Sequence, residues 1–245
     1  MMKMEERLDK LLIQRQLISS RVRAEKIIIE SGVLVNGKLI TKPGKKIPTD
    51  AAIELLEEEI PWVSRGALKL LKALDYWPID IEDKTAIDLG ACTGGFSEVL
   101  LSKNCTKVYS VDVGTNQLHP RIKENNRIVD LQQTHVRELT NNLIPELVDL
   151  IVIDVSFISL EKVLPFLHPF IKPNGKVIAL VKPQFEAGKE NVPKTGIIKD
   201  TKIHLEVVEN VKKYALMSNF NYLEHIDSPV LGGDGNKEFL MLLEK

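Results

Sequence analysis

The sequence predicts an α/β protein in which a small basic α+β domain precedes a doubly wound, mostly parallel sheet of seven strands. From residue 64 onward, short apolar runs alternate with helical patterns, which is typical of parallel strands joined by helical crossovers. Before residue 60, two short helical patterns lead into an Asn-Gly dipeptide between apolar runs, a strong hairpin signal. We therefore expect domains at 1–59 and 64–245, joined by a linker at 60–63 in which Pro61 interrupts helix and ladder alike.

The charge of the chain is unevenly distributed. Residues 1–46 carry eleven Lys and Arg against five Asp and Glu, although the whole chain of 245 residues has a net charge of −1. A basic segment on an otherwise acidic protein favours an acidic partner, and nucleic acid is the usual one.

The cysteines and the apolar segments indicate where the protein works. Cys92 and Cys105 are too few for a disulfide framework and lack zinc spacing, which favours a reducing cytoplasm. The N-terminus has no secretory pattern, and the apolar run 147–160 is short and interrupted by Asp149 and Asp154. We therefore expect a cytoplasmic protein with no membrane association.

The N-terminal segment has an ordered pattern of short elements. A helical stripe begins at Leu8, and a second helix, capped by Ser19 or Ser20, ends at Gly32. The run 33–40 then forms a hairpin, and another short strand follows near residues 53–56.

This pattern, with R-L-D-K-L-L, S-R-x-x-A and V-x-V-N-G in sequence, resembles the RNA-binding domain of the ribosomal protein S-four type over about residues 5–56. The alternative is a solvated basic surface on a structural domain. The resemblance and the charge together imply that RNA is bound by basic residues, for which the candidates are Arg7, Lys10, Arg15, Arg21, Arg23, Lys45 and Arg65.

Seven apolar runs account for the expected sheet. The last two are joined by a glycine-rich stretch without a helix, so we expect them to pair as an antiparallel hairpin. The seven runs lie at 85–89, 107–112, 127–129, 150–154, 176–181, 222–226 and 238–243.

A glycine-rich turn follows the first of these strands, where open α/β sheets bind ligands. The turn lacks the G-x-G-x-x-G spacing of dinucleotide sites, because Cys92 stands at the third position. A carboxylate at Asp112, ending the next strand, could accept both hydroxyls of a ribose. These features favour S-adenosylmethionine over NAD, with a purely structural turn as the alternative. The expected cofactor-binding residues are Asp88, Gly90, Ala91, Thr93, Gly94, Gly95, Phe96, Asp112 and Asp154.

Four charged residues are expected to meet beside this turn. Asp154 and Lys182 end adjacent parallel strands, and Glu238 begins an antiparallel strand whose start lies on the same edge. Lys69 lies on the preceding helix, one turn after Arg65. Each has a structural alternative, such as a helix cap, a loop lysine, an edge-strand charge or a solvated lysine. Their expected convergence favours a catalytic role.

The Lys-Asp-Lys-Glu set resembles that of FtsJ-like ribose 2′-O-methyltransferases, and the chain as a whole resembles the TlyA family, whose members are described as hemolysins and as rRNA (cytidine-2′-O)-methyltransferases. The resemblance implies a Rossmann-like seven-stranded methyltransferase sheet, with Lys69, Asp154, Lys182 and Glu238 as the catalytic residues. The chain ends directly after its last strand, as the shorter family members do. The resemblance to these members implies that the partner is large-subunit rRNA or a ribosomal subunit. The segments that carry it are 62–70, 88–96, 154–160, 180–186 and 235–238.

The chemistry explains why these residue types would be needed. A ribose 2′-hydroxyl is a weak nucleophile, and a lysine close to a second cation holds its proton less tightly and can act as a base. We expect Lys182 in that role, Lys69 as the neighbouring cation, and the two carboxylates as partners of the lysines. The histidines at 119, 135, 168, 204 and 225 show no ligand spacing, so we expect no metal and interpret them as structural or surface residues.

Two other classes of function stay open at this point. One is a membrane-active hemolysin, which the family description invites. The other is a non-catalytic RNA-binding factor of ribosome assembly, which loss of the four charged residues would favour, and all four are present.

Overall fold

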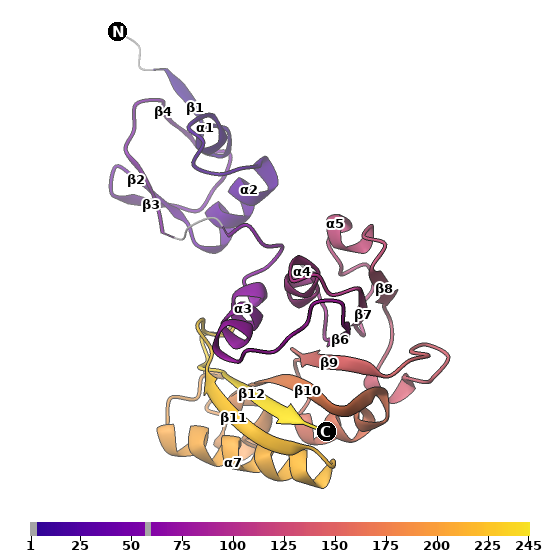
Figure 1. The fold of residues 1–245 in the computed structure, drawn as a ribbon. Coiled ribbons are helices and arrows are strands. Elements are labelled where there is room, and N and C mark those ends of the chain that lie inside the picture. The colour runs from indigo at the N-terminus through magenta and orange to yellow at the C-terminus, as the bar shows by residue number, and fades with distance from the viewer. Residues whose placement is uncertain (1–3, 57–59) are drawn as a thin grey trace. The chain divides into compact units, whose positions relative to one another are not determined.

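The computed structural model describes residues 4–56 and 60–245. The chain divides into two compact units, Met1–Pro61 and Trp62–Lys245 (Figure 1).

The N-terminal unit is built from short elements. A two-stranded antiparallel sheet pairs the first strand with the fourth, and a three-stranded antiparallel sheet has the order β3-β2-β5. Its elements are β1 (Glu5–Arg7), α1 (Leu8–Gln14), α2 (Arg21–Glu30), β2 (Val33–Val35), β3 (Lys38–Ile40), β4 (Lys46–Pro48) and β5 (Ile53–Leu55).

The turns of this unit follow the expected signals. Ser20 caps α2 by accepting a hydrogen bond from the backbone N–H of Arg23. Asn36 and Gly37, at φ 50° and 75°, form the tight turn of the β2–β3 hairpin. Leu8 and Ile28, from the two helices, are fully buried in a small common core.

The C-terminal unit contains the seven-stranded sheet that the sequence predicted, and its strand order is β11-β12-β10-β9-β6-β7-β8. β12 runs antiparallel to both β10 and β11, so the expected hairpin of the last two strands is confirmed, and the remaining neighbours are parallel. The strands are β6 (Thr85–Leu89), β7 (Lys107–Val111), β8 (Ile128–Leu131), β9 (Val148–Ile153), β10 (Ile171–Val181), β11 (Asn221–Asp227) and β12 (Phe239–Glu244).

The crossovers are less helical than the sequence predicted. Between β9 and β10 the chain forms three consecutive 3₁₀ turns, because Pro165 and Pro169 remove backbone donors that an α-helix needs. The helical elements are α3 (Gly66–Tyr76), α4 (Gly95–Ser102), α5 (Pro120–Lys123), α6 (Pro183–Glu186), α7 (Thr201–Met217), η1 (Val136–Glu138), η2 (Leu160–Lys162), η3 (Leu164–Phe166), η4 (His168–Phe170) and η5 (Lys189–Asn191).

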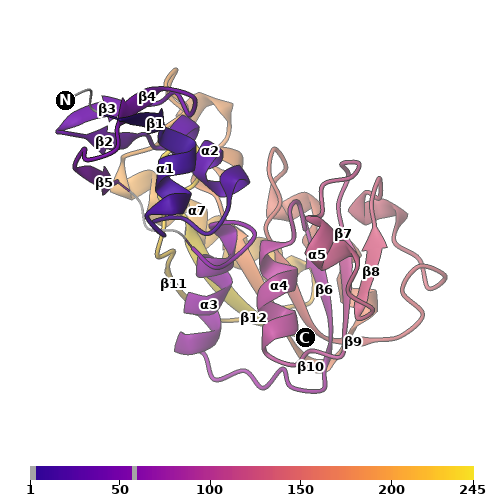
Figure 2. The same cartoon turned by 90° about the horizontal axis from the view of Figure 1, so that it is seen from above.

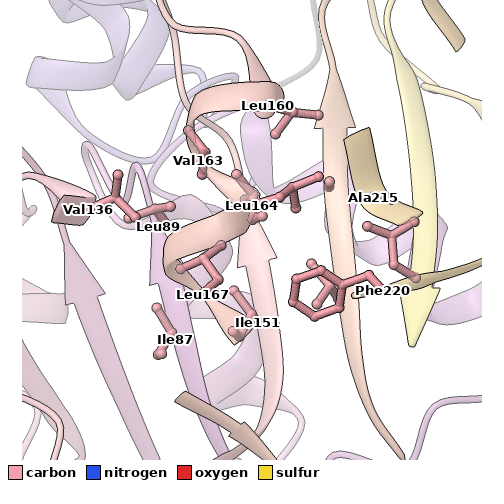
Figure 3. Close-up of a cluster of buried hydrophobic side chains, with 14 of the residues drawn as sticks. Ile87, Leu89, Val136, Ile151, Leu160, Val163, Leu164, Leu167, Ala215 and Phe220 are labelled. Atoms are coloured by element: carbon pink, nitrogen blue, oxygen red, sulfur yellow. The ribbon is translucent and has the colours of Figure 1, made fainter. Parts of the chain in front are cut away.

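Both faces of the sheet are buried, and strand residues alternate between them. Ile87 and Ile151 join α7 and the 3₁₀ turns in one core, which also contains Phe220 (Figure 3). Ala86 and Val152 face the opposite side and pack against α3 and α4 (Figure 2). This three-layer arrangement directs the carboxyl ends of the parallel strands to one edge.

Within the part of the chain that the structure describes, no helix combines the length and apolar character needed to cross a bilayer.

Candidate active site

A pocket of about 350 Å³ opens at the carboxyl ends of β6, β7 and β9. This is the edge at which doubly wound sheets bind their ligands. Of the expected cofactor-binding residues, Gly90, Asp112 and Asp154 line it. Its other lining residues are Leu89, Cys92, Val111, Val113, Gly114, Gln117, Thr134, His135, Val136, Val155, Ser156, Phe157, Ile158 and Val163.

Gly90 is required by a close approach between two loops. It has φ +83°, and a Cβ at this position would lie 2.4 Å from the carbonyl oxygen of Asp154. Asp154 in turn donates its backbone N–H to the carbonyl of Leu89, so the turns after β6 and β9 are joined beside the pocket.

Gly95 is required at a helix contact. A Cβ there would lie 3.1 Å from the backbone nitrogen of Ala67, at the start of α3, and even closer to the side chain of Ser64. This glycine allows the N-terminus of α4 to meet that of α3. It acts through packing and, like Ala91, Thr93, Gly94 and Phe96, does not line the pocket.

The carboxylate of Asp112 organises the turn and faces the pocket. One oxygen accepts the backbone N–H of Cys92 at 2.8 Å, and the other accepts that of Gly114 at 2.7 Å. Each carboxylate oxygen can accept a further hydrogen bond. The geometry is consistent with the expected contact to two ribose hydroxyls.

The side chain of Asp88 does not lie at the pocket, where a cofactor-binding residue was expected. Its side chain is fully buried, and Oδ2 accepts both the backbone N–H and the hydroxyl of Ser97, at 2.8 and 2.6 Å. Its Oδ1 has no hydrogen-bond partner among residues 4–56 and 60–245, and burial raises the pKa of this carboxyl to about 7. Asp88 thus holds the first turn of α4 from within the core, instead of touching the pocket. The sequence could not distinguish this inward side chain from an outward one.

The four charged residues form two ion pairs. Lys182 Nζ lies 2.7 Å from Asp154 Oδ1, and Lys69 Nζ lies 2.7 Å from Glu238 Oε2. Both lysines and Glu238 are buried, with exposed fractions of 8% for Lys69, 7% for Lys182 and 2% for Glu238. Removing the charges of such an ion pair from water costs free energy, so the pair contributes little to folding stability. A functional role explains buried ion pairs of this kind more readily.

The strand register explains why these pairs share an edge. Val181 of β10 pairs with Phe239 of β12, so Lys182 and Glu238 directly follow and precede the same antiparallel pair. β9 and β10 are parallel neighbours, which places Asp154 beside Lys182. Gly66 begins α3 close to Asp154, since a Cβ there would lie 3.7 Å from Asp154 Oδ2. Lys69 follows one turn later.

An aromatic pair beside these residues was missed by the sequence analysis. Phe157 is 89% exposed, has φ +64°, and lies with its ring 5.1 Å from that of Phe185. Lys182 Nζ is 6.0 Å from the centre of the Phe185 ring. A strained, exposed aromatic residue at a pocket is unusual, but from sequence alone Phe157 looks like an ordinary core residue.

His135 was also missed. We interpreted it as structural or surface, and it does cap η1, with its ring accepting the backbone N–H of Arg137. However, it also lines the pocket, next to Thr134 and Val136.

In the N-terminal unit, the arginines expected to bind RNA have protein partners. Arg7 donates two hydrogen bonds to the buried carboxylate of Asp9, at 3.0 and 2.7 Å, and this contact lowers the pKa of Asp9. Arg21 lies 3.4 Å from the same carboxylate and 3.1 Å from Glu25. Both guanidinium groups still have exposed surface, at 38% and 55% of the side chain.

Arg15 departs most clearly from its expected role. Its guanidinium donates to the backbone carbonyls of Thr49 and Ala51, the latter at 2.7 Å, so it ties α1 to the segment before β5.

The other basic candidates differ in how exposed they are. Lys10 and Lys45 are exposed, as expected of phosphate-binding residues. Arg23 is half-buried, and Arg65 is exposed at the N-cap of α3 in the C-terminal unit.

The seven-stranded sheet and the pocket at its strand ends are those of a methyltransferase. The family model for FtsJ-like methyltransferases matches residues 62–245, and that for S4 domains matches residues 6–53. The chain belongs to the FtsJ-like methyltransferase family and carries an S4 domain.

Three relatives illustrate the family. The chain is 37% identical to the 16S/23S rRNA (cytidine-2′-O)-methyltransferase TlyA of Mycobacterium tuberculosis, covering 97% of this chain and 89% of that one. It is 40% identical to YqxC of Bacillus subtilis, a candidate rRNA methyltransferase, covering 98% of this chain and 85% of that one. A solved structure of a candidate hemolysin from Streptococcus thermophilus is 40% identical with a TM-score of 0.78, covering 99% of this chain and 89% of that one.

Proposed function

We propose that this protein transfers a methyl group from S-adenosylmethionine to the ribose 2′-hydroxyl of a cytidine in large-subunit rRNA, bound as free rRNA or within a ribosomal subunit. The single observation that carries the proposal is the pair of buried lysine–carboxylate contacts beside the strand-end pocket. The relatives support the substrate, because the M. tuberculosis protein is named as acting on cytidine in 16S and 23S rRNA. A protein with this substrate works in the cytoplasm.

S-adenosylmethionine supplies, when bound, a methyl group on a cationic sulfur. The pocket suits it, because the carboxylates of Asp112 and Asp154 line the cavity and favour a cation there. Asp112 would hold the ribose hydroxyls, Gly90 would allow close backbone approach, and His135 and Val136 would contact the adenosine. Asp88 would act indirectly, by fixing α4.

Lys182, as the neutral amine, would orient the 2′-hydroxyl of the RNA and take its proton while the oxygen displaces the sulfur of S-adenosylmethionine from the methyl carbon. Asp154 holds the side-chain nitrogen of Lys182 in place, and Glu238 does the same for Lys69. Much of the rate would come from this positioning, since it converts an encounter of two weak reactants into an oriented one. No part of this scheme requires a metal ion.

The exposed ring of Phe157 offers a flat apolar surface at the pocket opening. Unstacked bases bind to such surfaces, so Phe157 would stack on a base of the RNA segment that enters the site. The S4 domain would supply phosphate contacts from its basic residues, which bind without reading the sequence.

The test is to map ribose methylation of ribosomal RNA in cells with and without this protein, and in cells carrying Lys182→Ala. We expect one or more cytidine 2′-O-methyl groups to disappear from 23S rRNA in both altered strains. Methylation confined to 16S rRNA would correct the proposed subunit. An unchanged methylation map would refute the proposal. Lysis of red cells by the purified Lys182→Ala protein would instead support the hemolysin alternative.

A further inference from the structure

The side-chain nitrogen of Lys182 has a second contact, with a residue outside the four charged residues. Its Nζ donates a hydrogen bond to the hydroxyl of Ser156 at 2.9 Å, in addition to its contact with Asp154 at 2.7 Å. Both acceptors belong to the turn that follows β9, and Ser156 also lines the pocket. One neutral and one anionic oxygen thus hold a single buried amine.

Two contacts fix the orientation of a lysine nitrogen, whereas one does not. The nitrogen is tetrahedral, so three directions remain beside its bond to Cε. With Asp154 as the only partner, the nitrogen could present either of two remaining directions to a substrate. With Ser156 as well, one direction is left for the substrate, and it is the same in each catalytic cycle.

The position of Ser156 is itself fixed by the surrounding fold. Three residues further on, the buried carboxylate of Glu186 accepts the hydroxyl of Ser159 at 2.6 Å and the backbone N–H of Leu160 at 2.8 Å. Glu186 lies on α6, directly after Lys182. The turn that carries Ser156 is therefore anchored to the segment that carries Lys182, and the separation of the two side chains is set before substrate binds.

We propose that Ser156 is a positioning residue for methyl transfer: its hydroxyl fixes the Lys182 amine so that one nitrogen direction faces the ribose 2′-hydroxyl. The inference rests on the proposed function, because it needs Lys182 to be the residue that contacts that hydroxyl. Ser156 acts through Lys182 and needs no contact with the RNA.

The test compares Ser156→Val with Ser156→Thr, two variants of nearly equal shape that differ in the hydroxyl. Methyl transfer to unmethylated ribosomal subunits is measured in single turnovers at saturating S-adenosylmethionine, and cofactor affinity is measured by calorimetry. We expect the Val variant to be slower by about 10- to 100-fold, the order expected when a reacting group is misplaced, and the Thr variant to keep its rate within about 3-fold. Both should bind the cofactor like the unaltered protein.

Two further variants make the result specific. Ser102→Ala removes a hydroxyl that bonds to the Val99 carbonyl on α4, away from Lys182, and should leave the rate unchanged. Lys182→Ala tests the underlying function: if it methylates at a normal rate, the proposed function itself is wrong. If Lys182→Ala is inactive but Ser156→Val is fully active, only the role of Ser156 is refuted.

Two other outcomes would also overturn the inference. If Ser156→Thr fails as severely as Ser156→Val, the hydroxyl is not what matters. If the Val variant loses cofactor affinity while its saturated rate is normal, Ser156 contacts the cofactor and does not position Lys182.

Discussion

The carboxyl edge of the seven-stranded sheet and the basic N-terminal unit both carry charged side chains assigned to function, but they hold these charges differently. At the sheet edge, Lys69 is paired with Glu238, 169 residues further along the chain, and both are buried. In the N-terminal unit, Arg7 is paired with Asp9, two residues away, and Arg21 contacts Glu25 on the same helix. The ion pairs at the sheet edge join distant segments, whereas the shortest ion pairs of Arg7 and Arg21 join residues that are close in sequence, and the longer contact of Arg21 with Asp9 links α2 to α1.

This difference indicates which charged side chains can still change partners in the folded protein. The long-range pairs at the sheet edge hold lysines in a water-poor site, where their direction is fixed and interactions are strong. The local pairs of the N-terminal unit leave the arginines partly exposed. We expect such arginines to exchange a carboxylate contact for a phosphate contact when RNA binds.

Lys182→Ala should reduce the single-turnover rate of methyl transfer by about 10²- to 10⁴-fold, the usual range for loss of a general base. Cofactor affinity should hardly change, because Lys182 does not line the pocket. Lys182→Arg should also be slow, since guanidinium retains its proton and has a different shape. The matched control is Lys172→Ala, at the opposite end of β10, where the lysine pairs with Asp149 and is 45% exposed. A normal rate in Lys182→Arg would make Lys182 an electrostatic clamp instead of a base.

Asp88→Asn should change how stability depends on pH. The folded pKa of about 7 lies above the ordinary 3.8, so the folded protein binds the proton more tightly than the unfolded chain does. Stability should therefore fall as pH rises from about 4 to about 7, by at most about 4 kcal/mol. The amide of the variant has no charge to bury and can still accept from Ser97, so the variant should lose this dependence. The measurement is thermal unfolding across pH 4 to 8. Equal slopes for the two proteins would contradict the buried role of Asp88.

The sequence predicted the sheet edge well because parallel strands leave little freedom there. Because β9 and β10 are parallel neighbours, their carboxyl ends lie at the same edge, which brings Asp154 within reach of Lys182. Asp88 and Asp112 show the limit of this reasoning. Both stand at or just after the end of a strand, but the pleat turns one into the core and leaves the other at the pocket. A shift of one residue along the strand decides which way the side chain points, and the sequence pattern does not show that direction.

The sequence predicted the fold of the N-terminal unit better than it predicted which of its basic side chains are available to bind RNA. The Asn-Gly turn and the Ser20 cap are local signals with local causes, so they could be read directly. The partners of Arg15 are backbone carbonyls, which every segment possesses and no sequence pattern marks. Counting charges therefore identifies a basic unit without identifying which arginines are available.

Asp112→Ala should weaken binding of S-adenosylmethionine by about 1.5–3 kcal/mol, the order expected for hydrogen bonds to a charged group. Part of this loss would come from the turn itself, since Asp112 also holds the backbone N–H groups of Cys92 and Gly114. Asp112→Asn separates the two effects, because an amide keeps one acceptor. Calorimetry on both variants is the measurement. Unchanged affinity in a folded Asp112→Ala protein would place the ribose contact on another residue.

The smallest predicted effect compares two basic residues of the N-terminal unit. Lys45 is exposed, so Lys45→Ala should reduce the slope of log affinity against log salt for RNA by about 0.7 to 0.9, the release of one counterion. Arg15→Ala should leave this slope unchanged, because its guanidinium is engaged by the carbonyls of Thr49 and Ala51. It should instead lower the unfolding free energy by about 1–3 kcal/mol, the cost of leaving partly buried acceptors without donors. RNA titrations at several salt concentrations and denaturant unfolding of the same variants measure both quantities. A reduced salt slope in Arg15→Ala with normal stability would mean that Arg15 leaves its carbonyl partners to bind phosphate, and the distinction between engaged and available charges in this unit would fail.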